Sequence, residues 1–269
     1  MESFLSYGFL QRALVAGVFI AIACAVLGVF LILRKDSMFA HGLAHIAFAG
    51  VALGLFLNMM PLAVALFIAI LAALGILKLK ERAGLYSDTA IGIFSSVGMA
   101  VGILFASFAQ SFNVDLFSYL FGEILAIESS EVWLSVGLVM AVLLIVFINY
   151  HKFLYITFDP ESAKASGIKV SRLDILLTVL IAITVVLGMK IVGLLLVAAL
   201  VVIPAAAALQ VASNFKSALV ISSIVALFSV VFGLFLAFYF DFPASATIVL
   251  LSFFLFGLFF AFKSAKKFI

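Results

Sequence analysis

Long runs of apolar residues make up most of this chain, and they decide the solvent in which it can fold. A helix needs about 20 such residues to cross the hydrocarbon core of a bilayer. Backbone groups in lipid must satisfy one another, so the runs predict helices and not open sheets. Nine runs can be traced, over residues 13–33, 38–58, 61–77, 88–109, 130–149, 173–188, 191–211, 217–239 and 244–262. The sequence therefore predicts an all-α, polytopic transmembrane helix bundle of about nine spans, forming one domain over residues 1–269.

Composition supports lipid as the surroundings of this bundle. The chain is 68% hydrophobic and 10% charged, whereas soluble domains are about 45–50% apolar and about 25% charged. A net charge of +3 is too small to indicate a nucleic-acid partner. The single cysteine, Cys24, excludes a disulfide framework and a cysteine metal cluster. Residues 1–11 lack the basic region and cleavage site of a signal peptide, so we expect the first run to be a permanent span.

Basic residues gather in alternate connections between the runs. These connections and the tail carry Arg34, Lys35, Lys78, Lys80, Arg82, Lys152, Lys164, Lys169, Arg172, Lys216, Lys263, Lys266 and Lys267. Residues 58–61 carry no charge, and residues 113–131 carry acidic groups without lysine or arginine. Lys190 is an exception that we place in a tight turn between two runs. Because cytoplasmic loops are enriched in lysine and arginine, nine crossings of the cell membrane (inner or plasma membrane) place the N-terminus outside and the C-terminus in the cytoplasm.

Two histidines in the second run are the first candidates for chemistry. His41 and His45 are four residues apart, so both lie on one face of a helix. Imidazole suits divalent transition metals, and ionisable groups inside a membrane usually mark a transport path. The spacing therefore predicts metal contact by His41 or His45. The alternative is that the two rings serve helix packing or a cytoplasmic gate.

The acidic connection supplies further candidates. Residues 113–127 are apolar but too short to span, which is typical of a re-entrant or interfacial segment. Asp115 and Glu123 in this segment are candidate carboxylate ligands at an external ion entrance; the alternative is solvated loop charges. Asp88, before another run, is interpreted as a helix N-cap.

Residues 159–167 have the punctuation of a short helix. Asp159 is the expected N-cap, Pro160 the first helical residue and Gly167 the stop. A short helix between two spans is a natural docking element for a cytoplasmic partner; the alternative is an ordinary interfacial helix. The chain contains no G-x-x-x-x-G-K-[ST] loop, so a separate polypeptide must bind ATP if transport is driven by ATP.

Six segments in a fixed order carry a resemblance to a known family. They are residues 28–34, 43–54, 88–93, 120–125, 159–167 and 192–206. Over nearly its whole length the chain resembles the permease subunits of zinc, manganese and iron ABC uptake transporters. The resemblance implies a type II importer fold and a homodimer that binds a cytoplasmic ATP-binding subunit and an extracytoplasmic metal-binding protein. It implies a transported metal ion and no permanently bound cofactor.

The same resemblance implies roles for particular residues. Asp159, Pro160, Glu161, Ala163 and Gly167 correspond to the coupling element that seats in the ATPase. Relatives often carry Gly-Asp where this chain has Ala40-His41. Carboxylate oxygens suit manganese, whereas imidazole suits zinc or iron, so this departure favours zinc.

The expected function is translocation of a divalent metal ion by alternating access, with ATP hydrolysis by the partner. A siderophore or vitamin importer is one alternative, although its larger substrate needs a wide aperture. A secondary metal transporter coupled to protons or sodium is another, but we find no internal repeat and few carboxylates within the spans. A membrane scaffold is a third. An enzyme is not predicted, because the chain has no H-E-x-x-H and no nucleophile with a base.

Overall fold

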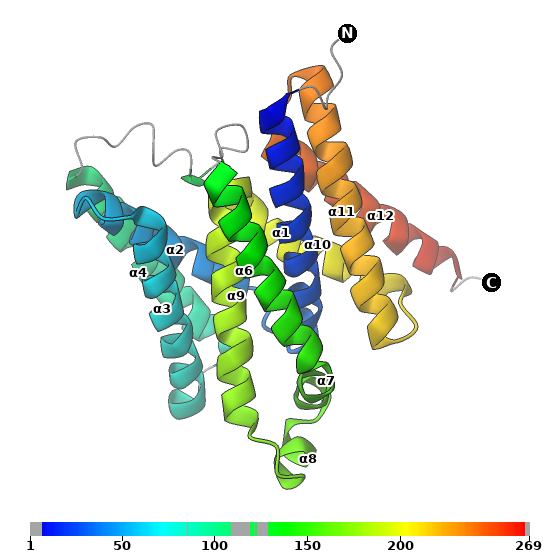
Figure 1. The fold of residues 1–269 in the computed structure, drawn as a ribbon. Helices are drawn as coiled ribbons and strands as arrows, with labels where there is room; N and C mark the ends of the chain where they lie inside the picture. The colour runs from blue at the N-terminus through cyan, green and yellow to red at the C-terminus, as the bar shows by residue number, and fades with distance from the viewer. Residues whose placement is uncertain (1–6, 85, 109–118, 121, 123–128, 267–269) are drawn as a thin grey trace.

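The computed structural model describes residues 7–84, 86–108, 119–120, 122 and 129–266 (Figure 1). Helices joined by short turns make up these residues, and no strand occurs among them. The helices are α1 (Gly8–Leu33), α2 (Phe39–Phe56), α3 (Pro61–Ala83), α4 (Ser87–Phe108), α6 (Ser129–Ile148), α7 (Tyr150–Phe158), α8 (Pro160–Ala165), α9 (Val170–Val192), α10 (Leu194–Val211), α11 (Phe215–Phe240) and α12 (Ala244–Lys266).

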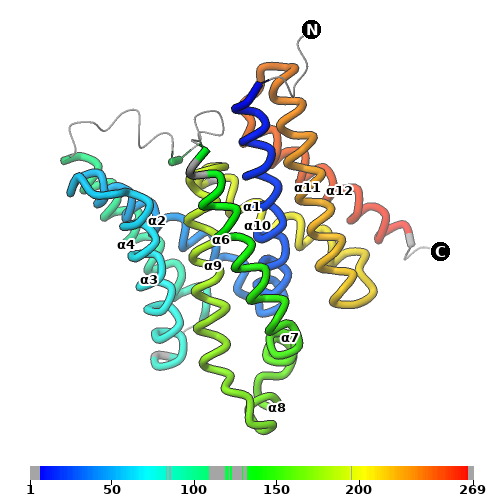
Figure 2. Tube along the Cα trace, viewed as in Figure 1, coloured from blue at the N-terminus to red at the C-terminus, as the bar shows by residue number. Residues whose placement is uncertain are grey.

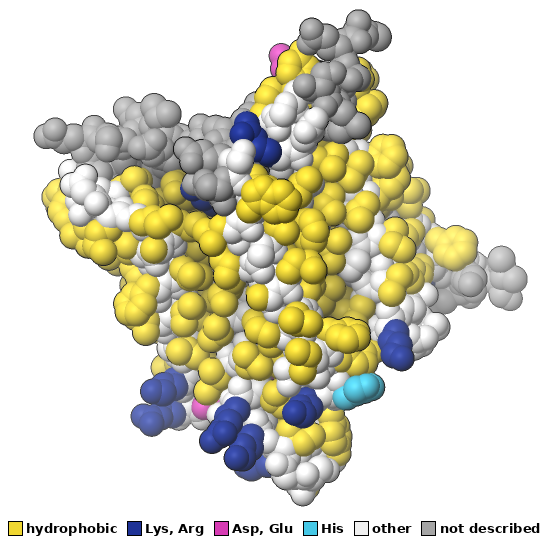
Figure 3. Space-filling view, viewed as in Figure 1, with side chains coloured by type: hydrophobic (Ala, Val, Ile, Leu, Met, Phe, Trp, Pro, Cys, Tyr) yellow, Lys and Arg dark blue, Asp and Glu magenta, His cyan; other side chains and the backbone are white. Residues whose placement is uncertain are grey.

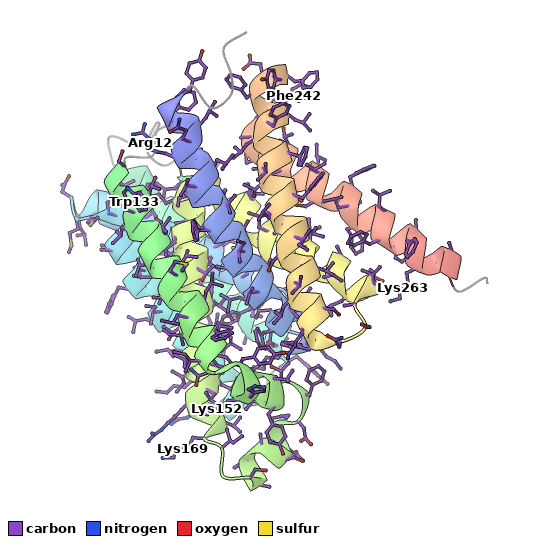
Figure 4. All side chains as sticks on the ribbon, turned by 45° about the vertical axis from the view of Figure 1, so that its right-hand side comes forward. Arg12, Trp133, Lys152, Lys169, Phe242 and Lys263 are labelled. Atoms are coloured by element: carbon purple, nitrogen blue, oxygen red, sulfur yellow. The ribbon has the colours of Figure 1, made fainter. Side chains whose placement is uncertain are left out.

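The two ends of the bundle differ in charge. Figure 3 shows most of the visible lysine and arginine side chains at its lower end, below an apolar band. Lys152 and Lys169 lie at this end, whereas Arg12 and Trp133 lie at the other (Figure 4). We call the end with Lys152 and Lys169 the basic end. This separation agrees with the sequence, because the fold brings the connections that are rich in lysine and arginine to the same end of the bundle.

Among the described residues, seven helices are long and apolar enough to cross a membrane, and an eighth span is possible if α6 and α7, bent by 68°, count as one. The helices match eight of the nine expected runs in this way. The remaining run, 191–211, contains only a shorter apolar helix, Leu196–Val211, so the length criterion does not support a ninth span. The expected bundle is therefore confirmed with seven or eight spans by length.

The difference from nine spans arises at the break between α9 and α10. We expected this break near Lys190, but α9 continues through it to Val192, so Lys190 lies in the last helical turn. The break falls at Gly193, whose φ of 94° favours glycine. Gly122, with φ 79°, lies against the same break, since a Cβ there would stand 2.4 Å from the carbonyl carbon of Val192.

Helix α2 is enclosed by its neighbours, mainly α3 and α4, with α9 and α10 on another side (Figure 2). Close approach depends on small residues. A Cβ on Gly50 would lie 2.5 Å from the Cα of Ala65 in α3, and one on Gly98 of α4 would lie 2.9 Å from the Cα of Ile46. In α2, 72% of the apolar span is buried, compared with 11% in α12. The bundle therefore holds α2 in its interior and leaves most of α12 exposed on its surface.

Candidate functional site

Helix α2 starts after a tight turn from α1. Lys35 adopts a left-handed conformation, with φ 59°. The Asp36 N–H donates to the Leu31 carbonyl at 2.9 Å, and the Phe39 N–H donates to the Asp36 carbonyl at 2.9 Å. These bonds close the end of α1 and start α2 with few intervening residues. His41 consequently lies in the first turn of α2, near the basic end.

His41 and His45 face each other on α2. Their Nε2 atoms are 3.1 Å apart, and their rings meet edge-on at 86° with centroids 4.6 Å apart. Both side chains are half-buried. The Nδ1 atom of His45 is buried without a hydrogen-bond partner. The sequence prediction that the two rings share one helix face is confirmed, and their Nε2 atoms lie within hydrogen-bond distance of each other.

This convergence fits a divalent transition metal. A metal–imidazole bond is about 2.0–2.1 Å long, so two such bonds at tetrahedral or octahedral angles separate their nitrogens by about 3 Å. Within the part of the chain that the structure describes, no group of three or more His, Cys, Asp or Glu side chains surrounds a common point. The described residues therefore offer two nitrogens here, fewer than the four ligands that hold structural zinc.

None of the acidic candidates Asp88, Asp115 and Glu123 is placed beside the histidine pair by the described residues. Asp115 and Glu123 lie outside the described residues, so their role as external ligands stays a prediction. Asp88 is exposed and lies inside the first turn of α4, which begins at Ser87. The interpretation of Asp88 as an N-cap was wrong by position. The hydroxyl of Ser87 instead donates to Asp36, which ties the start of α4 to the turn between α1 and α2.

The short helix α8 has the punctuation that its sequence predicts. Asp159 is the N-cap and accepts from the Ser162 N–H at 2.9 Å, and Pro160 is the first helical residue. Gly167, at φ 81°, follows the C-cap Ser166. Ala163 is fully buried, whereas its helical neighbours, including Glu161, are exposed. Helix α8 is thus held by local bonds and one buried methyl, and projects from the basic end (Figure 1).

The carboxyl group of Asp159, the N-cap residue of α8, has a shifted pKa. Hydrogen bonds from the side chain and the backbone N–H of Ser162 lower the pKa of Asp159 below its ordinary value. The carboxylate is therefore ionised at neutral pH, where its negative charge also suits the positive N-terminal end of a helix. The predicted capping role of Asp159 is confirmed; its contact with a partner stays a prediction.

Sequence reasoning missed two ion pairs at the basic end. Arg34 donates to Asp174 at 2.6 Å, and Lys80 donates to the two oxygens of Asp36 at 2.8 and 3.0 Å. Aspartates among lysines and arginines indicate that ion pairs form, but they do not identify the partners. Arg34 and Asp174 are 140 residues apart in the sequence. Only the fold brings these side chains together.

Comparison with known proteins identifies the family of this bundle. The family model described as ABC 3 transport family matches residues 6–263. The chain belongs to the ABC 3 transport family. It is 34% identical over 267 residues to the manganese transport system membrane protein MntC of Listeria innocua, covering 99% of this chain and 94% of that protein. It is 32% identical over 247 residues to the high-affinity zinc uptake system membrane protein ZnuB of Haemophilus influenzae, covering 91% and 94%.

A solved structure confirms the fold of this ABC 3 family member. PsaBC from Streptococcus pneumoniae in complex with Fab superposes with a TM-score of 0.86 at 35% identity, covering 96% of this chain and 94% of that chain. The family expected from the six sequence segments and the importer-permease fold are therefore both confirmed.

Proposed function

We propose that this chain is the membrane-spanning permease subunit of an ABC importer that moves divalent transition-metal ions (zinc, manganese or iron) across the cell membrane. The observation that carries the proposal is the 3.1 Å approach of the His41 and His45 Nε2 atoms on α2, inside a bundle of the ABC 3 transport family. The names of two relatives, one for manganese and one for zinc transport, support this class of substrate.

The donor atoms favour zinc or iron over manganese. Imidazole nitrogens suit zinc and iron, whereas manganese prefers carboxylate and carbonyl oxygens. With two imidazoles, the site is a loose one. Conduction requires binding weak enough for the ion to leave, so an open pair serves transport better than a closed tetrahedral site. The metal is cargo, and the proposal includes no permanently bound cofactor.

The basic end is the cytoplasmic end in this proposal. Lysine and arginine are enriched in cytoplasmic loops, which supports that orientation. Lys263 near the end of α12 donates to Gln210 near the end of α10 at 3.1 Å. This bond supports a cytoplasmic C-terminus, because α10 turns into α11 close to the basic residue Lys216.

Three protein partners complete the transporter. A cytoplasmic ATP-binding subunit receives α8, through Asp159, Pro160, Glu161, Ala163 and Gly167. An extracytoplasmic metal-binding protein delivers the ion to the end that carries Arg12. A second copy of the chain forms the other half of the pore. The exposure of α8, which buries only Ala163 among its described side chains, supports the first contact.

Transport then proceeds by alternating access. ATP binding draws the ATP-binding subunits together and displaces the two α8 helices. The pore between the two permease copies opens first to one side and then to the other. The ion passes the His41–His45 pair, which holds it through two nitrogens, and is released at the basic end.

Metal uptake in cells that lack their own zinc, manganese and iron importers tests this proposal. Cells that express the complete transporter should accumulate one of these metals under limitation, measured by elemental analysis. His45→Ala should lower uptake at least about tenfold, since even indirect support of a metal ligand is worth 10–100-fold in affinity. His151→Ala is the matched control, because His151 is an exposed imidazole at the basic end. Normal uptake by the His45 variant, or uptake without the ATP-binding subunit, would refute the proposal.

A further inference from the structure

Arg34 and Asp174 form a connection between two parts of the molecule that the sequence keeps apart. The guanidinium Nη2 and the carboxylate Oδ1 are 2.6 Å apart, and the side chains are only 20% and 15% exposed. Ion pairs in contact with water are worth little, whereas partly buried pairs with short contacts are stronger. This pair is therefore a firm contact between the end of α1 and the start of α9.

Asp174 lies directly beyond the docking helix. Helix α8 ends at Ala165 and α9 begins at Val170. The short connection is closed by hydrogen bonds, including Ile168 N–H to the Ala163 carbonyl at 3.1 Å and Leu173 N–H to the Lys169 carbonyl at 3.3 Å. Helix α8 also contacts α7 and α9. A displacement of α8 is therefore passed to the first turns of α9, where Asp174 lies.

Arg34 lies directly before the helix of the histidine pair. The turn from α1 to α2 is hydrogen-bonded throughout, through Lys35 N–H to Ile32 and Asp36 N–H to Leu31. His41 follows in the first turn of α2. Because these hydrogen bonds hold the turn together, a displacement of the Arg34 side chain moves the start of α2 and changes the orientation of His41.

A second contact holds the same turn from the other side. Asp36 accepts from Lys80 of α3 at 2.8 Å and from Ser87 at the start of α4. Arg34, Asp36, Lys80 and Ser87 line a small cavity of about 30 Å³. The Nη1 atom of Arg34 is buried without a hydrogen-bond partner, so the guanidinium uses one terminal nitrogen on Asp174. Arg34 and Asp36, which belong to different ion pairs, thus line the same cavity.

We propose that Arg34 and Asp174 are the coupling pair that transmits displacement of α8 to the turn before α2 and so to the His41–His45 pair. The bonds of Asp36 with Lys80 and Ser87 hold that turn to α3 and α4, and they return the turn to its starting position after the movement. These are positioning residues that act through the histidines. The inference rests on the proposed function, because it names the contact through which ATP hydrolysis by the partner subunit would change the position of the ion site.

The test uses the complete transporter in proteoliposomes, with ATP hydrolysis and zinc-65 uptake measured on the same preparation. Asp174→Asn keeps the size of the side chain but removes its charge. We expect the ratio of zinc imported to ATP hydrolysed to fall at least fivefold, the lower range of typical coupling between sites. Assembly with the ATP-binding subunit should be unchanged. Glu81→Gln is the matched control, since Glu81 is an exposed carboxylate near the end of α3.

Charge reversal separates coupling from a merely structural role. Arg34→Asp and Asp174→Arg should each lower the transport ratio, and the double variant should recover a substantial share of it. An unchanged ratio in Asp174→Asn would overturn the inference. Parallel loss of hydrolysis, assembly and transport, without recovery in the double variant, would also overturn it. Absence of zinc, manganese and iron transport by the unaltered complex would instead refute the proposed function.

Discussion

Helix α2 carries the proposed ion contact and α8 the proposed contact with the ATP-binding subunit, and the two helices are stabilised differently. Most of α2 is buried, and its position depends on backbone contacts with α3 and α4 at glycines. Helix α8 buries only Ala163 among its described side chains and depends on its own cap. The proposed ion site is therefore positioned by packing against helices that lie elsewhere in the sequence, whereas α8 is held mainly by its own hydrogen bonds.

The largest effect is expected where a methyl is added between α2 and α3. In Gly50→Ala, the new Cβ would lie 2.5 Å from the Cα of Ala65, so the helices must separate. Overpacking of this kind costs about 1–3 kcal/mol. Thermal unfolding of the purified protein in detergent should show the loss.

The matched control for Gly50→Ala is Gly92→Ala on α4, where a Cβ meets nothing within 4 Å. That variant should be as stable as the unaltered protein or up to about 1 kcal/mol more stable, since alanine favours helix over glycine. Equal unfolding temperatures for the two variants would contradict the contrast between packed and open faces.

Next in size is the response of the ion site to its donor atoms. His41→Asp replaces one nitrogen donor with oxygen, which should shift preference toward manganese. We expect the ratio of zinc to manganese uptake to fall about tenfold, equivalent to about 1.4 kcal/mol. Competition uptake with both metals measures the ratio. An unaltered ratio, with His151→Asp as control, would show that His41 does not contact the ion.

A smaller effect is expected at the cap of α8. Asp159→Ala removes the acceptor of the Ser162 N–H and should destabilise the first turn of α8. Co-purification with the ATP-binding subunit should weaken by up to about tenfold, while the unfolding temperature of the bundle stays the same. Asp159→Asn should restore binding, because asparagine also caps helices. If the alanine and asparagine variants bind equally, the cap has no part in docking.

The smallest effect concerns pH. The pKa of Asp159 is lowered in the folded protein, so its stabilisation is complete above the unfolded value of about 3.9 and disappears as pH falls through the folded pKa. Hydrogen-exchange protection of the Ser162 amide, corrected for intrinsic rates, should therefore be constant from pH 8 to 5 and decrease only at more acidic pH. A decrease near neutral pH would show that another group controls α8.

The same contrast explains what could be predicted from sequence. Helix α8 was found because Asp159, Pro160 and Gly167 act on residues beside them, and such signals are local. The facing of His41 and His45 follows from helical spacing. The Arg34–Asp174 pair was missed because its partners are 140 residues apart and meet only through packing.

Span boundaries show a similar limit. Lys190 was taken as the mark of a turn, but a basic residue in the last turn of a helix is also favourable, because it faces the negative end of the helix dipole. The backbone freedom of Gly193 decided the position of the break. Hydropathy alone does not distinguish these two cases.

The edge-on meeting of His41 and His45 has a consequence for the arrival of the ion. At 3.1 Å one Nε2 must donate a hydrogen to the other, so one lone pair needed by a metal is occupied. Before both nitrogens can bind, the donating ring must change tautomer and carry its hydrogen on Nδ1. With both Nε2 atoms on one metal, each neutral ring carries its hydrogen on Nδ1, and the Nδ1 of His45 is buried without a partner. Ion capture then requires a proton to move from Nε2 to Nδ1 of the donating ring, and we expect capture to slow in heavy water; equal capture rates in light and heavy water would contradict this requirement.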